Sequence, residues 1–286
     1  MFGFLQGVAV GSLAAIALFI VKYSRVNVVK HTLSGASFQS RVTRASRLRA
    51  ILHARGEQTH ILQLQGYLFF GTAHRLLEQV RGRFQQTDLP PVRFVVLDFR
   101  QMTGLDSTAI LSFTQLKQLA QDRAATLILT GLSPAMQAQF ASHGLGEAER
   151  TMKVFPDLDR GVEWCEAEIL RAEGAADEAG SLQQHIEQLL PEARHVETLL
   201  QYLKREDVAP NAYLIRQGDA PDVMYLLERG QVTAQLEPAS GGSPTRLETM
   251  RGGRVVGQIG FYLDLIVHLL AERVTHLIRA VDALLK

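Results

Sequence analysis

The chain has 286 residues, of which 47% are hydrophobic and 21% are charged, and its formal net charge is +1. This length and apolar content suit two modest domains with cores of their own and exclude disorder throughout. Because 30 Lys and Arg residues balance 29 Asp and Glu residues, no global basic field exists and we expect no nucleic-acid partner. The single cysteine, Cys165, cannot form an internal disulfide, which fits a reducing compartment.

The first segment, residues 1–22, is predicted to be a transmembrane helix. It carries no charged side chain as far as Val21, and its length matches the ~20 apolar residues that cross a bilayer. Lys22, Arg25 and Lys30 follow, so the positive-inside rule places the rest of the chain in the cytoplasm, at the inner (cytoplasmic) membrane. The alternatives are a signal peptide, although the basic n-region is absent, and a buried core helix. A helix that begins at the first residue is expected to be the last helix of something longer.

Residues 23–58 are expected to be a basic connector, and residues 59–172 an α/β domain. The near-continuous apolar run 92–99 indicates a buried, central strand. Strands are also predicted at 60–65 and 125–131, and helices at 71–80 with Thr72 as N-cap, at 109–119, at 135–141 and at 158–171. This alternation of strands and helices predicts a layered α/β architecture.

Three segments carry a family resemblance: LQGYLFFGTA at 64–73, VVLDF at 95–99 and GLDSTA at 104–109. They resemble the STAS domain attached to bacterial SulP permeases, which are sulfate and other anion transporters. The hydrophobic first helix and its exit at 21–25 resemble the last transmembrane segment of such permeases. The resemblance implies a mixed sheet with helices, a regulatory role through protein binding, and no catalytic activity.

The loop before the helix at 109–119 contains the candidate switch, Ser107, flanked by Asp106 and Thr108. In the related anti-sigma-factor antagonists, the serine directly after the Asp of this loop is phosphorylated, and Ser107 is the matching residue. From the residues alone, the simplest role of Asp106 or Ser107 is to cap the helix. A phosphate on Ser107 would be favoured by the helix amides and opposed by Asp106, so both interpretations stay open.

Residues 173–182 are predicted to be a linker, because the run EGAADEAG at 173–180 is small and acidic and lacks apolar periodicity. A second unit is predicted at 183–263, with one or two helices between 189 and 203. Its strands are expected at 213–216, 223–227 and 232–236. The segments 214–219, 224–230 and 257–262 resemble successive turns of a cyclic-nucleotide-binding domain.

This second unit departs from the family that it resembles. Gln258, in the run Gly257-Gln258-Ile259, replaces the Glu that contacts the ribose in that family, and no arginine motif for the cyclic phosphate follows Leu263. The nucleotide pocket is therefore interpreted as vestigial, and no cofactor is expected, cyclic nucleotide included. Residues 264–286 are predicted to form an amphipathic helix that covers the partial β-roll or pairs with a second copy of the chain, as a homo-oligomer.

No motif indicates catalysis or a metal site. The histidine spacings fit no zinc site, the glycine-rich run 252–257 reads as a turn, and Cys165 has no neighbouring base that we can name. The leading hypothesis is a non-catalytic regulatory module that binds a permease transmembrane body, or another protein, at the membrane. The alternative is a stand-alone membrane-tethered phosphoswitch acting through Ser107, and a third interpretation is a truncated, internally deleted product.

Overall fold

The computed structural model describes residues 2–24, 27–145, 151–175, 186, 196–216, 218–220, 222–237 and 244–259. The chain divides into two compact units. The first comprises Met1–Arg41 and Ala45–Ala176, and the second comprises Val42–Arg44 and Asp177–Lys286.

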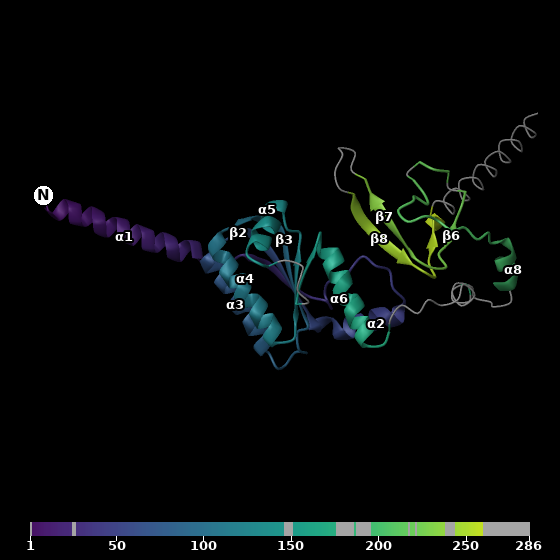
Figure 1. Ribbon diagram of the computed structural model, residues 1–286, viewed down its shortest axis with the longest axis horizontal. Helices are drawn as coiled ribbons and strands as arrows, with labels where there is room; N and C mark the ends of the chain where they lie inside the picture. The colour runs from purple at the N-terminus through teal and green to yellow at the C-terminus, as the bar shows by residue number, and fades with distance from the viewer. Residues whose placement is uncertain are drawn as a thin grey trace, which may run out of the picture. The chain divides into compact units, whose positions relative to one another are not determined.

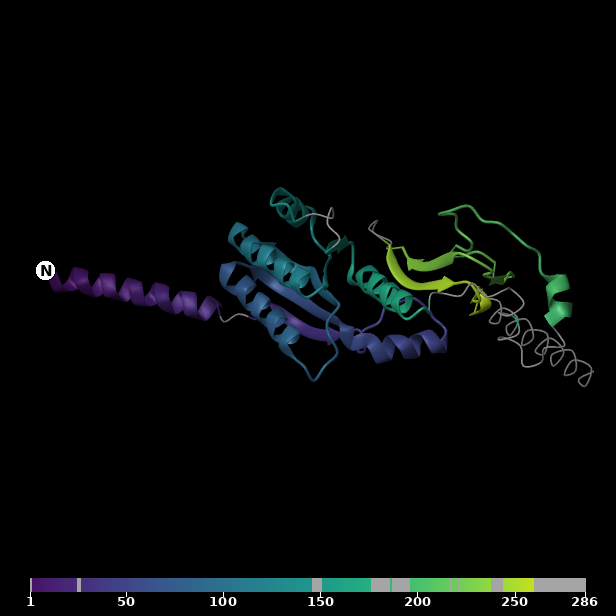
Figure 2. The same ribbon diagram turned by 60° about the horizontal axis from the view of Figure 1, so that its bottom comes forward.

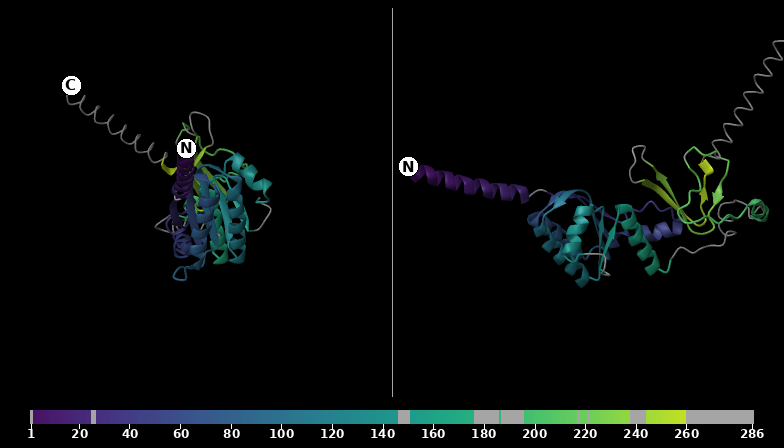
Figure 3. Two further views of the ribbon diagram at one scale, coloured as in Figure 1. Left: turned by 90° about the vertical axis from the view of Figure 1, so that its left-hand side faces the viewer. Right: turned by 45° about the horizontal axis from the view of Figure 1, so that its top comes forward.

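The hydrophobic first segment is a single continuous helix, α1 (Phe2–Ser24), as Figure 3 shows. Its helical character agrees with the prediction from its uncharged sequence. Within the described ranges, however, no helix meets the combined requirements of length and apolarity for crossing a membrane. The predicted membrane span at residues 1–22 is therefore not confirmed.

The first unit is built on a mixed sheet of five strands in the order β1-β2-β3-β4-β5 (Figure 1). The strands are β1 (Val29–Ser34), β2 (Thr59–Leu68), β3 (Phe94–Leu105), β4 (Thr126–Thr130) and β5 (Met152–Phe155). Strand β1 runs antiparallel to β2, whereas β2, β3, β4 and β5 are parallel neighbours. The parallel strands require helical crossovers, and these supply the helix layer on one face of the sheet.

Helices cover both faces of this sheet (Figure 2). They are α2 (Ser46–Arg55), which continues into a single turn η1 (Gly56–Gln58), α3 (Phe70–Gln85), α4 (Ser107–Asp122), α5 (Pro134–Ser142) and α6 (Leu158–Ala172). The apolar side chains of α3, α4 and α5 share one core cluster, and those of α2 and α6 share another. The fold is thus a three-layer α/β arrangement.

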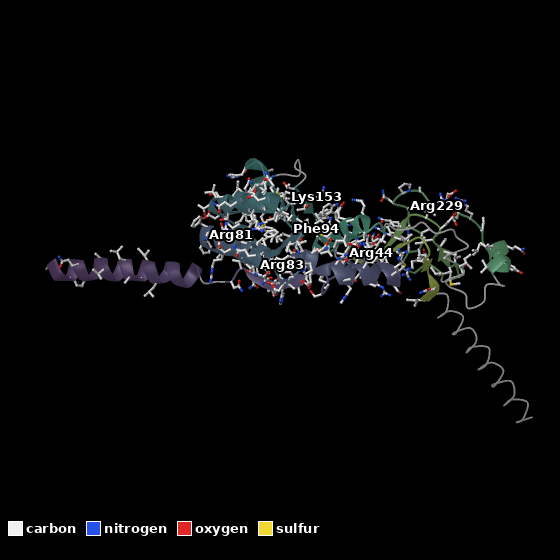
Figure 4. The ribbon with its side chains drawn as sticks, turned by 90° about the horizontal axis from the view of Figure 1, so that it is seen from below. Arg44, Arg81, Arg83, Phe94, Lys153 and Arg229 are labelled. Atoms are coloured by element: carbon white, nitrogen blue, oxygen red, sulfur yellow. The ribbon has the colours of Figure 1, made fainter. Side chains whose placement is uncertain are left out.

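Strand alternation divides the two cores, because successive side chains of a strand point to opposite faces. The side chains facing α3, α4 and α5 include Leu62, Leu97 and Leu129. Those facing α2 and α6 include Ile61, Val96 and Ile128. On the α6 side, Trp164 meets the Phe94 ring edge-on at 5.6 Å and lies 5.1 Å below the ammonium of Lys153; Figure 4 labels Phe94 and Lys153.

The central strand, the mixed sheet and the helix order agree with the sequence prediction, but two details were wrong. Residues 23–58, expected to be a connector, contain β1, α2 and η1. Thr72 does not cap α3; the cap is Phe69, and Thr72 lies in the first turn, where its hydroxyl accepts from Phe69 N at 3.0 Å. The first error arises because β1 and α2 bury few apolar residues.

The second unit contains α8 (Val196–Tyr202), β6 (Tyr225–Leu226), β7 (Gln231–Leu236), β8 (Thr245–Arg251) and β9 (Val255–Val256). β7 pairs with β8 and β6 with β9, both antiparallel. The segment Val42–Arg44 joins this unit, since Thr43 N donates to Thr249 O at 3.0 Å. The predicted strand at 213–216 is absent from the structure, a partial β-roll is not confirmed, and the predicted helix at 264–286 lies outside the described residues.

Candidate functional site

The candidate switch lies between the end of β3 and the start of α4. This is the edge of the sheet at which the parallel strands end. Leu105 ends β3 opposite Leu68 of β2, and Asp106 N donates to Leu68 O at 2.8 Å. The Asp106 carboxylate then accepts from Thr108 N at 2.7 Å, so Asp106 is the N-cap of α4. The sequence left this cap open between Asp106 and Ser107, and the structure assigns it to Asp106.

Ser107 is exposed at the first position of α4, and its hydroxyl donates to Asp106 Oδ1 at 3.3 Å. The hydrogen bond from the backbone N–H of Thr108 is the largest cause that lowers the pKa of Asp106. The carboxylate beside Ser107 is therefore ionised at neutral pH. A group added to Ser107 would meet both this negative charge and the positive end of the α4 dipole.

Exposed apolar side chains surround this junction. Tyr67 at the end of β2 is 48% exposed, Phe70 at the start of α3 is 58% exposed, and Leu111 of α4 is 65% exposed. Leu111 comes four residues after Ser107, so the two share one face of the helix. We call Tyr67, Phe70 and Leu111 the apical patch. Large apolar side chains exposed together on neighbouring elements are typical of a binding surface.

Local contacts hold the two aromatic rings of the apical patch in place. The Phe70 ring stacks on His74, one turn later in α3, with centroids 6.3 Å apart. The Tyr67 ring lies over Gly104, where an added Cβ would come within 2.8 Å of Cε2. Gly104 therefore leaves room for the ring to lie flat on β3. A fixed aromatic ring loses little freedom on binding, which favours its use as an anchor.

Sequence reasoning did not single out the apical patch. Tyr67 and Phe70 belong to the segment that carries the family resemblance, but no role was assigned to them. Leu111 was included in the apolar pattern of its helix and is instead exposed. The buried residues of α4 include Ile110, Phe113 and Leu116. Leu111 lies outside this buried stripe. Its different position around the helix was the feature of the sequence that could have indicated its exposure.

The other residues singled out by the sequence do not form a site in the described structure. Gly257 follows β9 with φ +86°, and a Cβ there would lie 2.8 Å from Val223 O, so the glycine serves a tight turn. Gln258 and Ile259 are both exposed. Cys165 is buried in α6, and burial raises the pKa of its thiol, which suits a core residue rather than a nucleophile. Among the described residues, no cluster of metal-ligating side chains occurs.

Comparison with known proteins finds a family match within the first unit. Residues 52–161 match the family described as STAS domain. The vacuolar basic amino acid transporter VSB1 of Saccharomyces cerevisiae is 27% identical over 176 residues, which cover 59% of this chain and 17% of that protein. Glutaminase 1 of Bradyrhizobium diazoefficiens is 25% identical over 231 residues, covering 79% of this chain and 35% of that protein. The chain thus spans about a third or less of either relative's length.

Solved structures are also similar to part of this chain. A sulfate transporter family protein from Wolinella succinogenes is 21% identical, covers 40% of this chain and 88% of its own, and gives a TM-score of 0.34. The STAS domain of a SulP transporter from Vibrio cholerae is 19% identical over 38% and 81% of the two chains, with a TM-score of 0.31. The anti-sigma factor antagonist SpoIIAA is 16% identical over 38% and 90%, also with a TM-score of 0.31. By the family match, residues 52–161 correspond to a STAS domain.

Proposed function

We propose that the chain is a non-catalytic regulatory module of a SulP-type anion permease, and that its STAS domain binds a protein partner through the apical patch at the cytoplasmic face of the membrane. The observation that carries this proposal is the exposure of Tyr67, Phe70 and Leu111 around the capped start of α4. Interface cores are enriched in aromatic and large apolar side chains, and these three come from adjoining elements. The partner is the permease's transmembrane body.

Attachment to the membrane through α1 is part of the proposal. This helix has 23 residues, and its exposed apolar side chains include Phe4, Val10 and Leu13. Apolar surface of this kind is unfavourable in water and favourable in a bilayer or between other membrane helices. The limited coverage of the yeast transporter, 17% of its length, supports the expectation that the module belongs to a larger membrane protein.

The second unit is proposed to act without a nucleotide. Gln258 is exposed and stands where the ribose-binding carboxylate would be expected, and the sequence has no arginine motif after it. A buried phosphate without a guanidinium or a nest of amides is poorly compensated. We therefore expect no cofactor.

Site-specific photo-crosslinking tests the partner proposal. A photoreactive amino acid placed at Leu111 of the full chain, in native membranes, is expected to crosslink to a multi-span permease body that mass spectrometry identifies. The matched control is Asp88, an exposed residue of the loop that follows α3, at the opposite end of this helix from Phe70. Equal crosslinking from both positions, or crosslinking from Leu111 to soluble proteins alone, would contradict the proposal.

A second candidate function is a phosphoswitch of the anti-sigma-antagonist type. The exposed hydroxyl of Ser107, beside the amides that begin α4, favours it, whereas the ionised Asp106 carboxylate opposes a phosphate at this position. Crosslinking from Leu111 in Ser107→Asp and Ser107→Ala forms separates the two functions. Partner exchange that follows the charge at position 107 supports the phosphoswitch, and equal crosslinking in both forms supports permease docking alone.

A further inference from the structure

A polar pocket of about 520 Å³ opens in the first unit at the end of β2 that is remote from the apical patch. It lies between the end of β1, η1, the start of β2 and the C-terminal part of α3. Its lining includes Ser34, Ser37, Glu57, His60, Gln79 and Arg83. The volume falls within the range of about 300–1,000 Å³ that is usual for small-molecule sites. Hydroxyl, amide, carboxylate, imidazole and guanidinium groups therefore meet in one small space.

His60 is the most unusual member of this lining. Only 7% of its surface is exposed, and its Nε2 atom is buried without a hydrogen-bond partner in the described structure. Burial is the largest cause that lowers its pKa to about 4, and the positive charge of Arg83 adds to it. The imidazole is therefore neutral at pH 7. A buried polar atom without a partner is unfavourable, so this imidazole lies in the pocket wall at a cost in stability.

Arg83 and Glu57 give the pocket one positive and one negative group. Arg83, labelled in Figure 4, is 8% exposed, and its Nη2 donates to Glu57 O at 2.9 Å and Pro90 O at 3.1 Å. Both bonds use Nη2, so Nη1 is the terminal nitrogen of the guanidinium that they do not engage. The Glu57 carboxylate accepts from the Ser34 hydroxyl at 2.7 Å, which fixes its position.

We propose that this pocket binds a free α-amino acid with a polar, uncharged side chain. A simple anion would be attracted to Arg83 but repelled by the Glu57 carboxylate. A simple cation would be attracted to Glu57 but repelled by Arg83. A zwitterion satisfies both charges, since its carboxylate can accept from Nη1 of Arg83 and its ammonium can donate to the Glu57 carboxylate. The side-chain carbonyl of Gln79, whose Nε2 donates to Thr32 Oγ1 at 3.1 Å, supplies an acceptor for an uncharged polar side chain.

The pocket is separate from the apical patch. Gly82 and Arg83 lie near the C-terminal end of α3, whereas Phe70 begins the same helix. A helix of 16 residues is about 24 Å long at 1.5 Å per residue. Amino-acid binding is therefore a property additional to partner docking, and either can fail in experiment without the other.

Calorimetric titration of the full chain in detergent micelles tests this inference. L-serine, L-asparagine and L-glutamine are the probes, and saturable binding is expected for at least one of them. N-acetyl-L-serine lacks the ammonium, and L-serine amide lacks the carboxylate; the corresponding derivatives serve for the other two amino acids. Each derivative is expected to bind at least about tenfold more weakly than its parent, equivalent to the loss of one charge-assisted contact.

Two variants connect binding to the pocket. Glu57→Gln removes the negative charge at nearly constant shape and is expected to weaken binding about tenfold. Gly82→Leu fills the pocket from α3, where an added Cβ meets nothing within 4 Å, and is expected to abolish binding while the helix is retained. Gln118→Leu on α4 is the matched control and should bind like wild type. Absence of saturable binding by all three amino acids, or undiminished binding in Gly82→Leu, would overturn the proposal.

Discussion

At the scale of single residues, His60 should make the stability of the STAS domain depend on pH. Its folded-state pKa of about 4 lies below the ordinary value of 6.5. As the pH falls through this window, the unfolded chain takes up the proton first and gains stability relative to the folded chain. The free energy of unfolding should therefore decrease by roughly 3 kcal/mol between pH 6.5 and 4 from this group alone.

Urea unfolding of wild type and His60→Gln at pH values from 4 to 7 checks this prediction. The two groups that act on the imidazole charge, Arg83 and Glu57, remain in both proteins. The variant should show a shallower fall in stability below pH 6.5. Thr59→Ser, at a neighbouring buried and non-titrating position of β2, should lower stability without changing this slope. Identical slopes for wild type and His60→Gln would show the prediction to be wrong.

The sequence around His60 indicates that this residue is buried, although the sequence analysis did not use this signal. His60, Leu62 and Leu64 are in phase on β2, and all three are buried. Arg83 likewise comes three residues after the buried Val80 of α3. Both polar residues therefore continue buried stripes. The pairing of these two stripes was not predictable, because it depends on how α3 crosses the sheet.

At the scale of elements, two helix glycines should respond in opposite ways to the same change. An added Cβ at Gly161 of α6 would lie 2.6 Å from Thr130 Cγ2 and 3.3 Å from Ile128 Cγ2, both on β4. Gly161→Ala should therefore force α6 away from the sheet and destabilise the unit by about 1–3 kcal/mol. At Gly82 of α3 nothing lies within 4 Å of the added Cβ. Gly82→Ala should stabilise the unit by about 0.5–1 kcal/mol through helix propensity.

Guanidinium unfolding midpoints of the two alanine variants measure this contrast in one domain. Each variant serves as the control of the other, because both add the same methyl group to a helix glycine. A stabilising effect at Gly161, or equal effects at the two sites, would mean that α6 does not pack as closely on β4 as the 2.6 Å approach indicates.

Helices and strands with a complete apolar pattern could be predicted from the sequence. Those at the edge of the fold could not. β3 and α4 each carry a long buried stripe, and both were predicted. In contrast, α2 buries one side chain, Leu52, and β1 buries one residue of its six, Val29. β5 has only four residues. Edge strands and helices covered on one side need few apolar residues, so their periodicity is weak.

At the scale of the whole molecule, the division between the units, at Ala176 and Asp177, falls inside the acidic run that was predicted to be a linker. The inclusion of Val42–Arg44 in the second unit was not predictable. This contact joins residues about 200 positions apart, through Thr43 and its hydrogen bonds to Glu248 and Thr249. Local pattern contains no information about a pairing of this kind.

The proposed membrane attachment makes α1 decisive for where the whole chain is found. Leu13 and Ile16 are 67% and 55% exposed, in the middle of a helix without a charged residue before Lys22. An Asp at the centre of an inserted helix costs about 3 kcal/mol, so two should shift the equilibrium by about 6 kcal/mol. Leu13→Asp with Ile16→Asp should therefore release the chain from membranes.

Flotation with vesicles of phosphatidylethanolamine and phosphatidylglycerol measures this release. The wild-type chain should float with the vesicles, and the double variant should stay in the dense, soluble fraction. The control places the same two changes at Gln115 and Gln118, exposed positions of α4 in the STAS domain, and should float like wild type. If the double variant floats equally well, α1 is not the attachment, since the added charges act only on this helix. If the wild type fails to float, the apolar surface of α1 must be covered by protein rather than by lipid.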